Sequence, residues 1–184
     1  CHYIMVKDSA GLALASLDSS IQLARTSLDN YNDLQRAFLE LKSRSSFLEV
    51  QLKKVKADAE KITTPELKEE TGKNILTEDA IFERITKELS ALEPTVDRLK
   101  ERAKALETMI EQKPAPEKNK EEQTMSTMKL SLFILKTLVD CQKDYFRVLR
   151  QLAIVRFYVE TLENLLSGEI SRDEAEKALR SRKR

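Results

Sequence analysis

The amino-acid sequence predicts an all-α protein, with three long helices that carry heptad seams and with short connecting and C-terminal helices. The 184 residues include only 3 glycines and 4 prolines, whereas sandwiches, barrels and Rossmann-type domains need many more turn residues. Apolar residues recur at alternating steps of three and four over long stretches, which is typical of a coiled coil or an elongated helical bundle.

The first long coiled-coil helix is expected within residues 1–62, where no Pro or Gly follows Gly11. Its seam supplies the first set of candidate partner contacts: Leu14, Leu17, Ile21, Leu28, Leu34, Phe38, Leu41, Leu48, Leu52 and Val55. Because the pattern is longer than either of the later ones, we expect this helix to overhang them by ~20 Å. The overhang would expose the N-terminal part of the seam, and exposed apolar strips usually mark protein interfaces.

A connector with a short helix is expected over 63–77. Thr64 and Pro65 form a typical N-cap and first helical residue, and Gly72 is expected to stop this helix. The second coiled-coil helix is expected over 78–112, with Pro94 kinking or restarting it. Its seam supplies further candidate contacts: Phe82, Ile85, Leu89, Leu92, Val96, Leu99, Leu106 and Ile110.

A polar, flexible linker is expected over 113–125, followed by an apolar third helix over 126–167 that ends at Gly168. This helix is apolar on most sides and therefore needs cover on most sides. It adds Leu135, Phe146 and Leu149 to the candidate contacts. Residues 168–184 are expected to form a short helix that a capping box over 171–174 opens. The chain ends in a basic tail: Arg180, Arg182, Lys183 and Arg184.

The sequence indicates no enzyme. The one histidine, His2, lies beside the start of the chain, and Cys1 and Cys141 have no ligand spacing. We expect Cys141 to be a small core residue. The step from Gly72 to Lys73 lacks the other residues of a phosphate-binding loop. The sequence therefore predicts no catalytic, cofactor-binding or metal-binding residue, no cofactor and no small-molecule substrate.

The charge balance bears on partners and on location. There are 32 basic and 31 acidic residues, and a nucleic-acid-binding protein usually carries a clear basic excess. No apolar run is long enough to span a bilayer, so we expect a cytoplasmic or nuclear protein, with a lipoprotein anchored at Cys1 as a minor alternative. The basic tail is interpreted as a nuclear-import patch, as a contact for acidic partners, or as favourable charge at a helix C-terminus.

The heptads and the turn residues between them resemble those of small helical subunits in kinetochore, spindle, tethering and adaptor complexes. This resemblance implies a structural or scaffold subunit of a multi-subunit, cytoskeleton-like assembly that binds other protein subunits through its helices. Charges beside the seams, such as Lys42, Lys56, Glu88, Glu93 and Arg102, would select the partner, which favours a hetero-oligomer over a homodimer. The alternatives are an elongated membrane-surface protein resembling BAR domains and a nucleic-acid-associated scaffold. The neutral charge balance counts against both.

Overall fold

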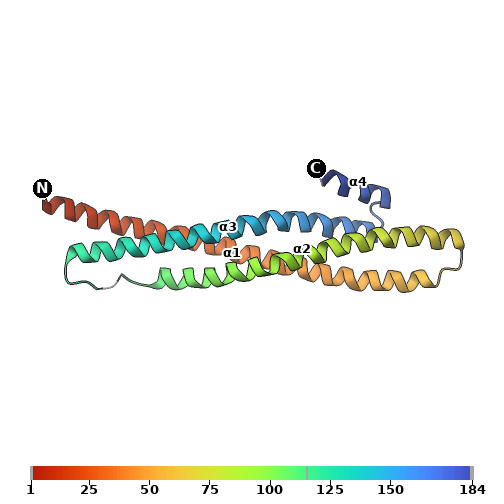
Figure 1. Cartoon of the computed structure of the whole chain (residues 1–184), viewed down its shortest axis with the longest axis horizontal. Helices are drawn as coiled ribbons and strands as arrows, with labels where there is room; N and C mark the ends of the chain where they lie inside the picture. Colours follow the sequence, from red (N-terminus) through yellow and green to blue (C-terminus); the bar gives the residue numbers. More distant parts are fainter. Residues whose placement is uncertain (1, 115, 183–184) are drawn as a thin grey trace. The chain divides into compact units, whose positions relative to one another are not determined.

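The computed structural model describes the backbone of residues 2–114 and 116–182, and side chains from residue 8 onward within these ranges. Four helices account for nearly all of it: α1 (His2–Glu60), α2 (Pro65–Glu111), α3 (Lys120–Ser167) and α4 (Arg172–Arg182) (Figure 1). No strand occurs in the described ranges, which confirms the all-α prediction. The chain forms two compact units, and each long helix contributes one segment to each unit.

The first unit comprises Cys1–Gln35 and Pro94–Val148. Here α1 and α3 run in the same direction: Ser20 Oγ lies 2.7 Å from Ser131 Oγ, and further along both helices the rings of Tyr31 and Tyr145 lie 5.4 Å apart. The α2 segment runs the opposite way along α3. These three segments bury an apolar core with these members: Ala13, Leu17, Ala24, Leu28, Tyr31, Leu34, Val96, Leu99, Leu106, Ile134, Leu138, Cys141 and Val148.

The second unit comprises Arg36–Glu93 and Leu149–Arg184. Here α1 and α2 run antiparallel, since Lys42 pairs with Glu93 at 3.1 Å and Lys56 pairs with Asp79 at 2.8 Å. The core of this unit is again apolar and has these members: Phe38, Leu41, Leu48, Leu52, Ile81, Ile85, Leu89, Leu92, Leu152, Val155, Tyr158, Val159, Leu162 and Ala175.

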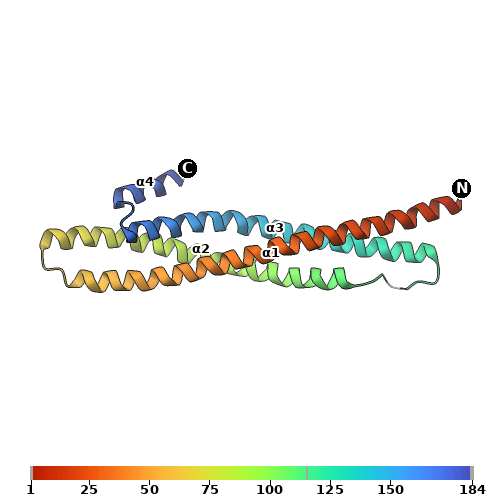
Figure 2. The ribbon, with the colours of Figure 1, turned by 180° about the vertical axis from the view of Figure 1, so that it is seen from behind.

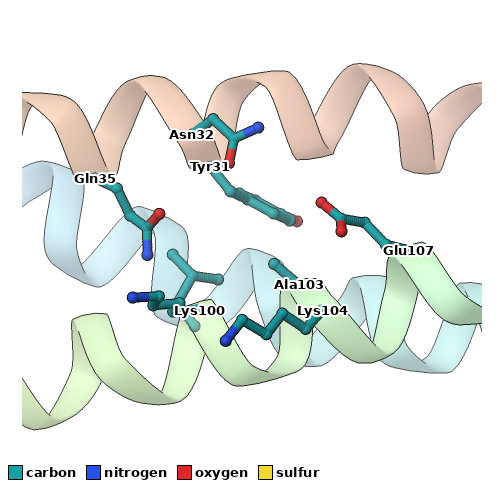
Figure 3. A pocket seen from close by; sticks show the side chains of 8 residues that line it. Tyr31, Asn32, Gln35, Lys100, Ala103, Lys104 and Glu107 are labelled. Carbon is teal, nitrogen blue, oxygen red and sulfur yellow. The ribbon is translucent and has the colours of Figure 1, made fainter.

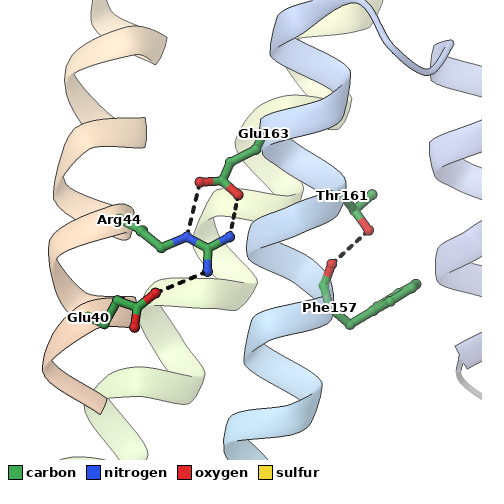
Figure 4. Close-up of polar contacts among 5 residues, drawn as sticks. All are labelled: Glu40, Arg44, Phe157, Thr161 and Glu163. Atoms are coloured by element: carbon green, nitrogen blue, oxygen red, sulfur yellow. Dashed lines mark hydrogen bonds and ion pairs between the residues drawn. The ribbon is translucent and has the colours of Figure 1, made fainter. Parts of the chain in front are cut away.

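One ion pair joins α1 to α3 on the surface of the second unit. Arg44 donates two hydrogen bonds to the carboxylate of Glu163, and Glu40 lies 3.8 Å from the same guanidinium (Figure 4). Two parallel N–H···O bonds fix the angle as well as the distance between the groups. The pair therefore sets the register of α1 against α3 in this unit.

The predicted stop at Gly168 and the predicted N-cap at Ser171 are confirmed. Gly168 has φ +82°, and the amides of Gly168 and Glu169 donate to Leu165 and Asn164, as in a Schellman motif. The Ser171 hydroxyl accepts a hydrogen bond from the amide of Glu174 at 3.1 Å, which caps α4. The side chain of Arg172 then reaches back to α2, where Glu70 lies at 3.1 Å.

The predicted stop at Gly72 is wrong, because α2 continues through this residue without a break. Glycine inside a helix costs only about 1 kcal/mol relative to alanine. Contacts from α4 offset that cost: Arg172 pairs with Glu70 before the glycine and donates to Asn74 after it, and Thr77 donates to Glu176. The predicted restart at Pro94 is also wrong, since α2 stays helical there.

The stretch between the second and third helices is shorter than predicted, because α3 begins at Lys120 rather than near residue 126. Asn119 caps it: its side-chain oxygen accepts from the amide of Glu122 at 2.8 Å. The longer α3 also removes much of the predicted overhang of α1. Leu17 and Leu28 are buried, and only Leu14 among the first seam residues is mostly exposed.

Candidate functional site

Most residues of the two predicted seams lie in the interior of their own unit. The buried ones are Leu17, Leu28, Leu34, Phe38, Leu41, Leu48, Leu52, Ile85, Leu89, Leu92, Val96, Leu99 and Leu106. Ile21, Val55, Phe82 and Ile110 are half-buried. The structure thus corrects the expectation that these seams face partner subunits, because helices of the same chain already cover them.

The charges beside the seams also find partners within the chain. Lys42 pairs with Glu93, Lys56 with Asp79, Glu88 with Arg84, and Arg102 with Asp144. Each of these pairs lies inside one unit. Glu88 and Arg84 lie one turn apart on α2, whereas the other three pairs join two helices and hold them in register. This differs from the predicted role in choosing another protein.

Four of the predicted contact residues are exposed: Leu14, Leu135, Phe146 and Leu149. Two of them belong to a larger apolar surface on α3 in the first unit, which we call the α3 stripe. The α3 stripe consists of Met128, Leu132, Leu135, Val139 and Phe146. Leu132 and Leu135 are 60% and 38% exposed, so the stripe projects into solvent although the helix beneath it is well packed.

Beside the α3 stripe lies a shallow groove of about 350 Å³ between α3 and α1. The α1 wall of this groove is formed mainly by small residues, Ala15, Ser16, Ser19 and Ser20, with Leu12 and Leu23 at its ends. On the α3 side, Leu135 lines the groove. Figure 2 shows α1 and α3 running side by side over this part of the first unit. Small side chains on one wall and leucine on the other make a surface into which a further helix packs readily.

The first unit also holds a buried carboxylate. Asp144 of α3 accepts hydrogen bonds from Arg98 at 2.8 and 2.9 Å and from Arg102 at 2.9 Å. The hydrogen bonds from Arg98, followed by the charges of both arginines, hold the pKa of Asp144 below its ordinary value. The carboxylate is therefore ionised at neutral pH and serves as a structural anchor between α2 and α3.

The second unit holds a buried carboxylate without such a partner. Glu78 is 6% exposed, and one of its oxygens has no hydrogen bond. Burial, with a smaller effect of Asp79, raises its pKa to about 7. It lines a pocket near the start of α4 together with Glu70, Asn74 and Arg172.

A further pocket of about 150 Å³ lies between α1 and α2 of the first unit (Figure 3). Tyr31 and Asn32 of α1 line it with Lys104 and Glu107 of α2. Burial, and then the charge of Cys141, raises the pKa of Tyr31 to about 12. The phenol is therefore protonated at neutral pH and is not a general base.

The basic tail is only partly described. Arg180 is exposed, and the guanidinium of Arg182 lies 4.9 Å from the centre of the Phe157 ring. Lys183 and Arg184 lie outside the described residues, as does Cys1, so the proposed tail contacts and the lipoprotein alternative have no structural counterpart here. Cys141 is a buried free thiol, as predicted.

Within the described ranges, no group of three or more His, Cys, Asp or Glu side chains is placed to hold a metal ion. In the same part of the chain, no helix has the length and hydropathy needed to cross a bilayer. Comparisons with family models, curated proteins and solved structures find no significant match.

Proposed function

We propose that this chain is a non-enzymatic structural subunit that binds other helical proteins of a larger assembly. The observation that carries the proposal is the α3 stripe. Large apolar side chains that stay exposed together on a folded helix usually mark a protein interface, because isolated soluble domains rarely keep such patches. The stripe also has the spacing of three and four residues that helix–helix packing uses.

The burial of the other seams supports the same proposal. The core of each unit is supplied by helices of the chain itself. The chain therefore brings an already folded surface to a partner, rather than a segment that folds only on binding. A pre-folded surface loses less conformational entropy when a partner binds. The ion pairs Lys42–Glu93 and Arg44–Glu163 add to this rigidity in the second unit.

The proposal is tested by the size of the complex that contains the chain in an extract of its source cells. Size-exclusion chromatography, with the chain detected by an antibody, should place it at a mass well above that of its own polypeptide, as read from a denaturing gel of the same fractions. A protein cross-linked to the chain should then form a stoichiometric complex with it when both are purified. Elution at the mass of the single chain, with no cross-linked protein, would contradict the proposed function.

A further inference from the structure

The lysines beside the α3 stripe point to the kind of partner that it binds. In heptad notation, Met128, Leu135 and Gln142 occupy the d positions of α3, and Leu132, Val139 and Phe146 occupy the a positions. The e positions that flank them are then Lys129, Lys136 and Lys143. All three lysines are exposed, and none forms an ion pair among the described residues.

We propose that the α3 stripe, with the groove beside α1, binds an amphipathic helix of another protein whose apolar face is flanked by glutamate or aspartate. This inference rests on the proposed function and names its binding face. A row of like charges at one e register attracts acidic residues at the facing positions of a partner and repels basic ones. The three unpaired lysines therefore fit an acidic helix.

The same face of α3 becomes polar at Arg156, ten residues after the stripe ends, which supports a specific role for the apolar part. In the second unit the same a and d register continues with Leu149 and Ala153 and then becomes polar, with Arg156, Glu160 and Glu163. Glu163 pairs there with Arg44 of α1. From Arg156 onward this face of α3 is thus polar, whereas residues 128–153 carry apolar side chains at every a and d position except Gln142.

A second copy of the chain fits this surface less well than an acidic helix does. If two α3 stripes met antiparallel, the e positions of one would face the e positions of the other, so lysine would oppose lysine. In a parallel pairing the e lysines would face g positions, which are Ser131, Leu138 and Tyr145 and offer no acid. Ser131 and Leu138 are also buried against the chain's own helices.

The groove supplies room for the proposed helix. It is lined by α1 and α3 alone, so α2 does not cover it. Ser16 and Ser19 are small enough to let a helix approach α1 closely, and Leu135 lies on the other wall. A helix seated there would cover Leu135, a d position of the α3 stripe, and bring its flank to the lysine row.

The test uses the full chain and two synthetic peptides of three heptads, both with Leu at the a and d positions. One peptide carries Glu at e and g and the other carries Lys. Affinities are measured by fluorescence anisotropy at low and high salt. The Glu peptide should bind at least about tenfold more tightly than the Lys peptide at low salt, because three ion pairs strengthen binding of the first peptide and three like-charge contacts weaken binding of the second. The preference should shrink as salt screens the charges.

Variants locate the site. The double variant Leu132→Gln/Val139→Gln should lose Glu-peptide binding, and both positions are exposed enough to tolerate the change. Leu39→Gln, an equally exposed leucine in the second unit, is the matched control and should bind as the original chain does. Changing Lys129, Lys136 and Lys143 to Glu should reverse the preference between the two peptides.

Several results would overturn the inference. If the two peptides bind equally well, or if neither binds, an acidic helix is not the partner of the α3 stripe. A homodimer abolished by Leu132→Gln/Val139→Gln would assign the surface to a second copy. Binding to phosphatidylserine vesicles, lost in the same variant, would assign it to a membrane. If Leu132→Gln/Val139→Gln still enters the large complex in cell extracts, the α3 stripe is not the binding face. The proposed function, membership of a larger assembly, would still stand.

Discussion

Glu78 makes the stability of the chain depend on pH in a direction that is easily measured. Its pKa in the folded chain is about 7, against an ordinary value of 4.5, because the carboxyl is buried and one oxygen has no hydrogen bond. Between these two values the folded chain holds a proton that the unfolded chain has released. Raising the pH through this window therefore lowers the free energy of unfolding. A shift of this size corresponds to about 3 kcal/mol, since one pKa unit is worth ~1.4 kcal/mol.

The measurement is urea unfolding of the original chain and of Glu78→Gln at several pH values between ~5 and ~8.5. The amide of Gln does not ionise, so we expect the variant to gain about 2–3 kcal/mol relative to the original chain across this range. Glu83→Gln, an exposed glutamate on the same helix, is the control and should leave the pH dependence unchanged. If the original chain and Glu78→Gln change in parallel with pH, Glu78 is ionised and hydrated in the folded chain and the reasoning fails.

Three other predictions follow from single residues. Asp144→Asn should lower the free energy of unfolding, measured in urea at pH 7, by about 2 kcal/mol. This difference should vanish as acid protonates the carboxyl of the original chain, whose pKa is lowered. An unchanged urea midpoint at pH 7 would refute the role of Asp144 as an anchor between α2 and α3. Gly168→Ala should lower the free energy of unfolding by about 1 kcal/mol because of its positive φ, whereas Gly72→Ala, two turns into α2, should raise it by a similar amount, and both changes are read from thermal melting. Equal effects of the two substitutions would contradict the two assigned conformations. The Cys141 thiol, with its pKa raised to about 11 by burial, should alkylate at least ~100-fold more slowly at pH 8 than a free thiol, as followed by peptide mapping, and rapid alkylation would show that α3 opens there.

The helices were predictable because their apolar residues recur at helical spacing and because caps are local. Thr64, Gly168 and Ser171 act through neighbours only a few residues away, so their sequence context is enough to locate three helix ends. Asn119 follows the same logic, since an Asn three residues before Glu122 is a recognisable N-cap pattern, although this cap was not predicted. Gly72 was misjudged because its helix depends on contacts with α4, which lies about a hundred residues further along the chain.

The candidate site was less predictable, because α3 carries two overlapping apolar registers. One includes Ile134, Leu138 and Cys141 and is buried, while the other is the α3 stripe and is exposed. Both have the spacing of a seam, so periodicity alone does not tell which of them faces α1 and α2. Leu135 and Phe146 were predicted as contacts, but Leu132 and Val139 were not. The lysine row at positions 129, 136 and 143 is the signal that separates the two registers, since cations flank only the exposed one.

The most direct test of the account is light scattering after size exclusion on the purified chain, combined with circular dichroism. Because the principal seams are satisfied within the chain and the lysine row opposes pairing of two α3 stripes, we predict a strongly helical monomer of 21.1 kDa that melts cooperatively. A chain that is largely unfolded or aggregated on its own would contradict the account, because its seams would then need another protein. A homodimer that Leu132→Gln/Val139→Gln converts to a monomer would contradict it as well.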